Sequence, residues 1–267
     1  MELEVIEKKM LALEQAECPV IHSFGPGVYI RELRMKAGTL AIGHHQKFEH
    51  MNIFIKGKVL MLNDNGSKVE LSAPMMFVGK PGRKIGYVLE DVVWLNIYAT
   101  TETNVEKLEA IYLEKSETWK ENDVKMKKLR RLVDTDDYKK IIGNMGLTES
   151  DVRKQTENEN DQVQMPYGSY KIAISESSIE GKGVFATANI ESDEIIAPAK
   201  LNDKRTPVGR YVNHSKTPNA KMVLIGINIF LVALNKIKGC TGGNLGDEIT
   251  TNYQKNVKLI GGIQCQE

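Results

Sequence analysis

Three short segments near the C-terminus hold the residues whose types and spacing are best suited to chemistry. They are residues 181–186 (GKGVFA), residues 210–219 (RYVNHSKTPN) and residues 246–253 (GDEITTNY). Glycines separated by one residue can let the main chain approach a bound ligand where a Cβ atom would clash. Asn213, His214 and Tyr253 can each form hydrogen bonds to such a ligand. The alternatives are an ordinary hairpin turn, a core histidine with its own partners and a buried strand tyrosine.

The order of these segments within about 75 residues resembles the SET domain, a family that moves a methyl group from S-adenosylmethionine to a lysine amine. The resemblance covers about residues 167–260. It implies that Asn213 bonds the amino-acid end of S-adenosylmethionine, that the His214 backbone contacts the adenine edge, and that Tyr253 is catalytic. The cofactor-binding residues implied are Gly181, Lys182, Gly183, Arg210, Asn213, His214 and Tyr253, and the catalytic residues implied are Tyr253 and Tyr211.

The implied reaction is an in-line displacement, which needs the donor and an uncharged amine held in line in a dry channel. It requires no metal ion and no covalent intermediate, and no metal site is expected in this segment. The Tyr253 hydroxyl could orient the lysine nitrogen and help to exclude its protonated form. An aromatic lining suits a methylated ammonium group. The candidates for that lining are Tyr211, Phe230, Tyr253 and Tyr167.

Several features depart from the family pattern, and they concern the choice of substrate. Lys216 stands where many relatives have a cysteine, and the tail from residue 254 lacks the family's zinc-binding cysteine cluster. Residues 195–210 are short where relatives often carry an insert that reads the substrate peptide. The segment of residues 238–246, before Asp247 and Glu248, is longer than the corresponding segment usually is in the family. The tail must then close the lysine channel by itself or leave it open.

The N-terminal part has a second candidate site on a different scaffold. Residues 20–100 contain six or more short β-rich runs, and Asn65-Gly66 between two of them is a hairpin signal. His44, Gln46 and His50, between Gly38 and Gly57, resemble the first cupin motif, with Gln46 replacing a histidine and His50 at the glutamate position.

The second cupin motif is incomplete. Its Pro81-Gly82 step is present, and its histidine is absent. Two imidazoles and a glutamine could hold zinc, iron or nickel, although a barrel without metal is the favoured interpretation. His45 points to the opposite face from His44 by strand alternation. Barrels of this kind look like those in bacteriophage-encoded proteins.

Composition limits the class of protein. The 267 residues include 36 Lys and Arg against 35 Asp and Glu, so a net charge of +1 predicts no attraction to nucleic acid or to a membrane. The three cysteines, Cys18, Cys240 and Cys265, form no Cys-x-x-Cys, which indicates a reducing compartment. No signal peptide or membrane span is expected. A cytoplasmic protein is predicted, in a host cytoplasm if the origin is viral.

The fold predicted is mainly β with a helical connector. Helices are expected over residues 136–142 and after the N-cap residue Thr148, strands over residues 170–174 and 248–253, and a hairpin around Gly226. A cupin-like jelly roll occupies residues 1–100, the connector and linker residues 101–166, and a SET-like β fold with a knot-like core residues 167–267. The preferred function is a protein-lysine N-methyltransferase that uses S-adenosylmethionine, with a lysine side chain of a protein as substrate. The alternatives are a non-catalytic binding or assembly module and a metal-dependent cupin oxygenase or isomerase. A homodimer through the cupin-like domain is a further possibility.

Overall fold

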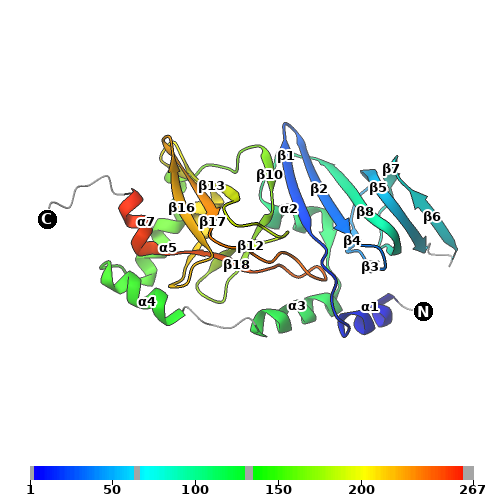
Figure 1. Ribbon diagram of the computed structural model, residues 1–267, viewed down its shortest axis with the longest axis horizontal. Helices are drawn as coiled ribbons and strands as arrows, with labels where there is room; N and C mark the ends of the chain where they lie inside the picture. Colours follow the sequence, from blue (N-terminus) through cyan, green and yellow to red (C-terminus); the bar gives the residue numbers. More distant parts are fainter. Residues whose placement is uncertain (1–2, 63–66, 130–134, 261–267) are drawn as a thin grey trace. The chain divides into compact units, whose positions relative to one another are not determined.

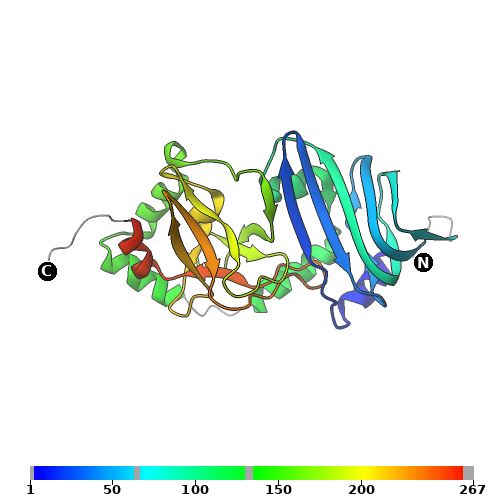
Figure 2. The same ribbon diagram turned by 45° about the horizontal axis from the view of Figure 1, so that its top comes forward.

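The computed structural model describes residues 3–62, 67–129 and 135–260. The chain is mainly β and forms two compact units (Figure 1 and Figure 2). Unit 1 comprises Met1–Leu129, Pro166–Lys171 and Gly239–Leu245; unit 2 comprises Arg130–Met165, Ile172–Lys238 and Gly246–Glu267. These bounds differ from the sequence-based division, because residues 101–129 pack within unit 1. Among the described residues, no helix has the length and apolar character that a bilayer crossing needs.

Eight strands of unit 1 form one sheet, in the order β10-β1-β2-β8-β5-β6, with β3 paired to β8 and β7 paired to β5. A separate small pair joins β4 to β9. The strands are β1 (Val20–Gly25), β2 (Val28–Met35), β3 (Leu40–Ile42), β4 (His45–Gln46), β5 (His50–Leu62), β6 (Lys68–Ser72), β7 (Met75–Gly79), β8 (Ile85–Ala99), β9 (Leu113–Glu114) and β10 (Gly168–Tyr170).

The two longest strands bend the sheet of unit 1 around an interior. β5 pairs with β7 through its first part and with β6 through its last, and β8 changes partner from β3 to β2 in the same way. The β5–β8 ladder shifts register on both sides of Lys56. Gly57 lies there with φ 95°, and a Cβ atom would stand 2.3 Å from the Asp91 carbonyl oxygen. This irregular step bends the strands, as bulges do, and it fits the cupin-like barrel predicted from sequence.

Two apolar clusters fill this unit. One contains Phe54, Val59, Val88 and Val92, all at most 2% exposed. The other contains Phe24, Tyr29, Tyr98 and Leu108. Their side chains alternate along the strands with outward-facing ones, because successive strand residues point to opposite faces.

Three helices belong to unit 1: α1 (Leu3–Leu11), α2 (Val105–Tyr112) and α3 (Glu117–Leu129). Glu7 of α1 is buried and is held by the Arg83 guanidinium and by the Ser116 hydroxyl at 2.7 Å. The segment Gly239–Leu245 also packs here, because Gly242 donates its backbone hydrogen bond to the Ala16 carbonyl at 2.9 Å. The long glycine-rich loop noted in the sequence is therefore part of unit 1.

Unit 2 contains two four-stranded sheets, β11-β12-β18-β15 and β14-β13-β17-β16. Its strands are β11 (Ile172–Glu176), β12 (Lys182–Ala186), β13 (Ile195–Leu201), β14 (Lys204–Arg205), β15 (Asn213–His214), β16 (Ala220–Ile225), β17 (Asn228–Ala233) and β18 (Glu248–Thr251). Its helices are α4 (Thr135–Asn144), α5 (Glu149–Glu157), the 3-10 turn η1 (Glu159–Asp161), α6 (Pro207–Tyr211) and α7 (Tyr253–Ile260).

The pairing of β15 with β18 is parallel, unlike every other strand pair described in unit 2. Asn213 lies opposite Thr250, and His214 lies opposite Thr251. A parallel pair needs a long connection between its strands, and here the connection is the β16–β17 hairpin with the chain that follows it. The arrangement places the Asn-His segment beside the C-terminal strand. The threading of a knot-like core stays a prediction.

Local sequence signals correspond well to several elements of unit 2. The helix predicted over residues 136–142 is α4, and Thr148 caps α5 through a capping box with Asp151, as predicted. The hairpin predicted at Gly226 joins β16 to β17 with φ 64° at that glycine. The hairpin residues Asn65-Gly66 lie outside the described residues, although the flanking strands β5 and β6 pair as expected.

Two element predictions were wrong. The single strand expected over residues 170–174 is broken at Lys171, so that β10 belongs to unit 1 and β11 to unit 2. The last strand, expected to reach Tyr253, ends at Thr251, and Tyr253 begins α7. In the first case, the residues expected to form one strand belong to two strands in different sheets. In the second, the Asn252 side chain accepts the backbone hydrogen bonds of Gln254 and Lys255, at 3.0 and 3.3 Å, and starts the helix.

Candidate functional site

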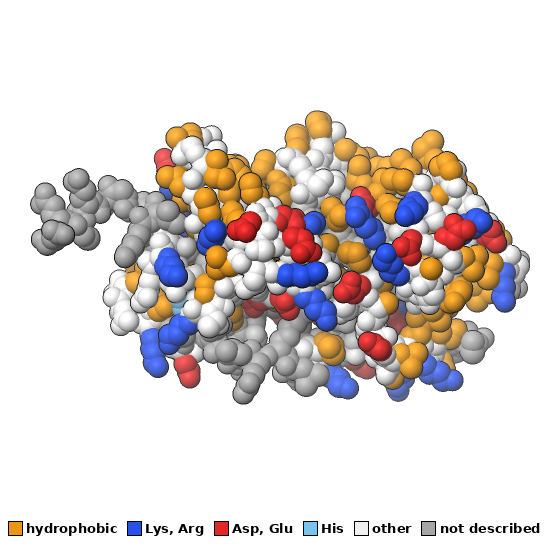
Figure 3. All heavy atoms as spheres, in the orientation of Figure 1, with side chains coloured by type: hydrophobic (Ala, Val, Ile, Leu, Met, Phe, Trp, Pro, Cys, Tyr) orange, Lys and Arg blue, Asp and Glu red, His pale blue; other side chains and the backbone are white. Residues whose placement is uncertain are grey.

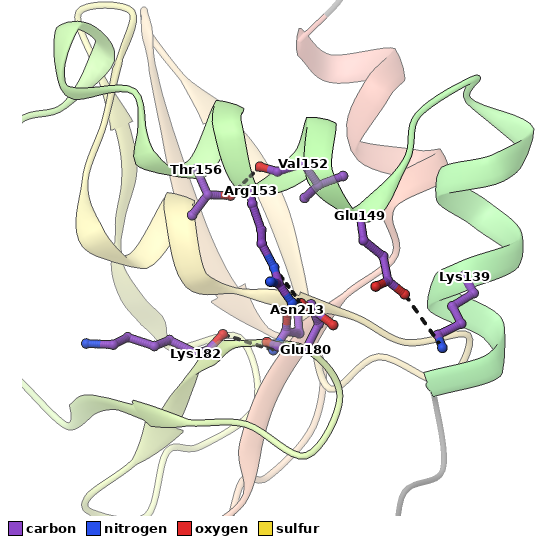
Figure 4. A network of polar contacts seen from close by, with 8 residues as sticks. All are labelled: Lys139, Glu149, Val152, Arg153, Thr156, Glu180, Lys182 and Asn213. Carbon is purple, nitrogen blue, oxygen red and sulfur yellow. Dashed lines mark hydrogen bonds and ion pairs between the residues drawn. The ribbon is translucent and has the colours of Figure 1, made fainter.

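The three sequence segments singled out for chemistry meet at the Asn213 side chain. Figure 4 shows Asn213 beside Glu180 and Lys182. Its Nδ2 atom donates to the carbonyl oxygens of Glu180 and Lys182, at 3.2 and 3.1 Å, and to Glu248 Oε1 at 2.8 Å. Because all three neighbours are acceptors, they fix the orientation of the amide group. Among the described residues, no donor bonds the Asn213 Oδ1 atom, which leaves an oriented acceptor at the meeting point.

Glu248 is the charged member of this cluster. The Ser177 hydroxyl lies 2.7 and 2.9 Å from its two carboxylate oxygens. A Cβ atom at Gly183 would lie 2.3 Å from Glu248 Oε1, so the missing side chain at Gly183 makes room for the carboxylate. Gly181 differs, because its φ is 50° and a Cβ atom there would meet open space. Of the two glycines, Gly181 is therefore the one at which a ligand could approach the main chain.

His214 and Asn219 hold the end of the chain in place. His214 is fully buried, and its Nδ1 atom accepts the backbone hydrogen bond of Tyr253 at 3.1 Å. Asn219 donates to the Glu248 carbonyl at 2.8 Å and accepts from the Thr250 amide at 2.9 Å, as a neighbouring strand would. The sequence indicated the motif around Asn219 and gave no sign of this backbone pairing.

The Tyr253 hydroxyl donates to the Val212 carbonyl at 3.0 Å, and its ring lies 5.2 Å from the His214 ring. Burial raises the pKa of this phenol far above its usual value, and Tyr138 and Glu248 raise it further. Tyr253 therefore stays protonated at neutral pH. It can position a partner through its oxygen lone pairs, and it is a poor general base.

Tyr211 and the two nearby cations form a second group. The Lys182 ammonium and the Arg210 guanidinium lie 6.0 and 5.2 Å from the Tyr211 ring centroid. Arg210 also donates to the Thr156 carbonyl of α5, while its buried Nε atom has no hydrogen-bond partner among the described residues. Arg210, predicted to bind the cofactor, is thus partly engaged with α5.

The two remaining lining candidates are placed differently. Phe230 lies on β17, in the other sheet of unit 2, opposite Val223 and Pro198. Tyr167 belongs to unit 1 and is 57% exposed. The structure does not group either residue with Asn213.

Sequence reasoning missed the support that helix α5 gives to the Gly181 bend. Arg153 of α5 donates to Glu180 Oε1 at 2.9 Å, and Lys139 of α4 pairs with Glu149 at 3.6 Å (Figure 4). Glu180 is the residue before the bend, and its carbonyl accepts from Asn213. A charged residue next to a glycine turn was the only sequence signal for this role.

In unit 1, the predicted metal ligands are used for other contacts. The Tyr98 hydroxyl donates to Gln46 Oε1 at 2.9 Å. The two His50 ring nitrogens lie 3.1 Å from the Phe48 carbonyl and 3.4 Å from Asn96 Nδ2. Burial, and then the charge of Arg31, lower the pKa of His44 to about 4, so its ring is neutral at pH 7.

This donor set does not fit a divalent ion. Of the three predicted ligands, only His44 has a buried side-chain atom without a partner, its Nδ1. No group of three or more His, Cys, Asp or Glu side chains suited to a metal occurs among residues 3–62, 67–129 and 135–260. The Asn52 side-chain Oδ1 atom instead accepts from Trp94 Nε1 at 2.8 Å and from Asn96 Nδ2 at 2.7 Å. Asn52, Trp94 and Asn96 are therefore bonded to one another rather than directed at a metal ion.

No family model matches the chain, and no curated protein matches its sequence. Solved structures similar to it include EutQ of Clostridium difficile, at 16% identity and a TM-score of 0.26, over 31% of this chain and 68% of that one. A cupin domain from Bordetella pertussis is 14% identical, with a TM-score of 0.27, over 33% of this chain and 99% of that one. A cupin-2 domain protein from Shewanella frigidimarina is 13% identical, with a TM-score of 0.26, over 35% of this chain and 91% of that one.

Two of these three structures are cupin domains by name, and each match covers about a third of this chain. The resemblances to SET domains and to bacteriophage-encoded proteins stay predictions.

Proposed function

We propose that unit 2 binds S-adenosylmethionine and transfers its methyl group to a lysine side chain of a protein. One observation carries the proposal: the Asn213 amide joins the glycine bend at Glu180 and Lys182 to Glu248 of the C-terminal strand. These segments were chosen from the sequence for their chemistry, and they are more than 30 residues apart along the chain. Packing alone gives no reason for them to meet at one hydrogen-bonding group.

The residues present suit the donor molecule in two respects. Asn213 Oδ1 is an oriented acceptor beside the Glu248 carboxylate, a setting that favours the ammonium group of an amino acid. Gly181 leaves open space in which a ligand can approach the backbone. S-adenosylmethionine supplies the electrophilic methyl group when it is bound. The chain's own groups hold it and keep it aligned with the amine.

Tyr253 is proposed as the residue that orients the lysine amine. Its hydroxyl hydrogen is directed to the Val212 carbonyl, so its oxygen can accept a hydrogen bond from an uncharged amine. Its raised pKa keeps the phenol neutral, and the proton of the lysine ammonium must leave to solvent before transfer. The positive charges of Lys182 and Arg210 beside Tyr211 disfavour a further cation nearby, and this would assist the loss of the proton from the lysine ammonium.

The test is a pair of measurements on the full chain. Calorimetry with S-adenosylmethionine should give binding that is lost in Asn213→Ala. Mass spectrometry after incubation with cell lysate proteins should give mass gains of one methyl group each, abolished in Tyr253→Phe. Tyr138→Phe is the matched control, because it removes a phenol from the same apolar cluster. Absence of binding to the native chain would refute the proposal.

A non-catalytic module is the second candidate. The specific observation in its favour is that the Tyr253 hydroxyl already has a partner in Val212, as expected for a structural residue. Binding of S-adenosylmethionine without methyl transfer would support it. A metal-dependent oxygenase in the barrel is not proposed, because the donor atoms there do not fit a metal ion.

A further inference from the structure

Unit 1 contains a cavity of about 850 Å³, which is lined by strands of its sheet and by residues of α1 and α3. This volume lies in the range of pockets that hold small organic molecules. Leu33, Val59, Met61 and Phe77 contribute apolar walls, and Arg31 and His44 contribute polar atoms. A ligand that fits the cavity therefore needs an apolar body and a polar group.

Strand register creates a polar row across the interior of the sheet. His22 lies opposite Arg31, Arg31 opposite Asn96, and Asn96 opposite Asn52, on four neighbouring strands. Directly opposed residues share one face of a sheet, so this row faces the same side. Asn52, Asn96 and His22 satisfy one another or nearby groups: Asn96 donates to Asn52, and His22 Nδ1 pairs with the Tyr29 hydroxyl at 2.7 Å.

Arg31 is the charged member of this row; the Glu109 carboxylate acts on it electrostatically without forming an ion pair with it. The buried carboxylate of Glu7 is paired with Arg83, and Glu109 is paired with Lys115 at 2.8 Å. Among the described residues, no carboxylate lies within 4.0 Å of Arg31. Glu7 and Glu14 also line the cavity, but neither forms an ion pair with Arg31. The Arg31 guanidinium can therefore still take the carboxylate of a ligand.

Two buried polar atoms at this cavity lack hydrogen-bond partners: Arg31 Nε and His44 Nδ1. A buried group of this kind costs about 1–3 kcal/mol if it stays unpaired. The His44 ring also rests edge-on against Trp119, with ring centroids 5.0 Å apart, so its position is fixed. A donor fork and a fixed imidazole beside an apolar pocket match the needs of a carboxylate that carries an apolar body.

We propose that the cavity of unit 1 binds a small organic acid without a metal ion. Its carboxylate pairs with Arg31 and His44, and its apolar body lies against Leu33, Val59 and Phe77. The site is separate from the methyl-transfer residues, so the inference holds or fails independently of the function proposed for unit 2.

Calorimetry on the full chain, without S-adenosylmethionine, tests this inference with octanoate and octanamide, which differ in charge and share the apolar chain. We expect octanoate to bind at least about tenfold more tightly, because only the acid forms a charged pair with the guanidinium. Arg31→Gln should lower the octanoate affinity to that of the amide. The matched control is Arg34→Gln, an exposed arginine on the opposite face of β2, and it should change nothing.

If Arg31→Gln proves unfolded by circular dichroism, Arg31→Lys replaces it and should weaken octanoate binding by losing the planar fork. The native chain gives a readout without any variant, since octanoate should shift the ring-nitrogen resonances of His44. Equal binding of the acid and the amide, or no binding of octanoate at millimolar concentration, would overturn the proposal. Unchanged affinity in a folded Arg31 variant would do the same.

Discussion

A single amide group, that of Asn213, satisfies two backbone carbonyls and one carboxylate in the candidate site of unit 2. Asn213 is 6% exposed, so water replaces these hydrogen bonds poorly. The same group orients the acceptor that the proposed donor molecule needs. Asn213, which the sequence indicated as a binding residue, thus also connects three segments of the fold.

Asn213→Ala should destabilise the sheet that contains β12 and β18 by about 2–4 kcal/mol, because it leaves several buried acceptors unpaired. Hydrogen exchange followed by mass spectrometry should report faster exchange in both strands. Asn160→Ala, an exposed asparagine of unit 2, is the control and should leave exchange unchanged. Equal protection of native and Asn213→Ala chains would contradict this account.

His22 makes unit 1 sensitive to acid. Burial, and then the Arg31 charge, lower the pKa of His22 to about 3, while Glu109 opposes the shift. The unfolded chain has a histidine pKa near 6.5 and so binds more protons than the folded chain between those values. The contribution of His22 to the free energy of unfolding is therefore fully present above about pH 6.5. It is lost as the pH decreases toward 3, by at most about 1.4 kcal/mol per pH unit.

This pH dependence can be measured by urea unfolding between pH 5 and 6.5, above the range where carboxylates are protonated. Both tryptophans, Trp94 and Trp119, lie in unit 1, so their fluorescence reports on that unit. His22→Gln should reduce the slope of stability against pH. His44, with a pKa of about 4, adds a similar slope that this variant keeps. A slope identical in both chains would show that His22 does not contribute.

At the scale of elements, the distance to neighbouring backbone atoms decides which glycines can be replaced by alanine. Gly209 of α6 lies where a Cβ atom would stand 2.0 Å from the Ala199 carbonyl oxygen on β13, and a backbone atom cannot easily move away. Gly143 of α4 would meet no atom within 4 Å. The same substitution should therefore act with opposite signs at the two positions.

Gly209→Ala should destabilise unit 2 by about 3 kcal/mol or more, as overpacking does. Gly143→Ala should stabilise α4 by up to about 1 kcal/mol, because alanine favours helices. Hydrogen exchange of β13 and of α4 measures each effect separately. Loss of protection in α4 after Gly143→Ala would be inconsistent with the open space around this residue.

Local patterns in the sequence were sufficient to predict most helices and strands, and insufficient to predict which strands pair and in which register. The capped helix at Thr148 and the hairpin at Gly226 depend on a few adjacent residues, so they were predictable. The polar row of unit 1 depends on the registers of four strands, and a shift of one residue would turn a strand's side chains to the other face. Arg31 therefore gave no sequence signal. The cluster at Asn213 was anticipated only through a family resemblance.

For the molecule as a whole, the expected homodimer stays a prediction, and the outer face of the barrel offers it a location. Met51 lies opposite Val78, and Ile53 lies opposite Met76, across β5 and β7. Met76 and Val78 are 67% and 56% exposed. Figure 3 shows hydrophobic side chains, in orange, at the surface of this part of unit 1.

The double variant Met76→Glu, Val78→Glu should convert a dimer into a monomer, because charges in an apolar interface lose their hydration. Light scattering after size-exclusion chromatography measures the mass directly. Glu70→Lys, an exposed change on β6, is the control. A native chain that is monomeric at micromolar concentration would remove the basis for this prediction.

Strand β10 and the segment Gly239–Leu245 belong to unit 1, although the chain around them belongs to unit 2. The polypeptide therefore leaves unit 1 and returns to it twice. A gene truncated anywhere between the codons of Leu129 and Pro166 would encode the sheet of unit 1 without its edge strand β10 and without the contact at Ala16. Neither unit can be inherited, exchanged or expressed as one uninterrupted stretch of the coding sequence.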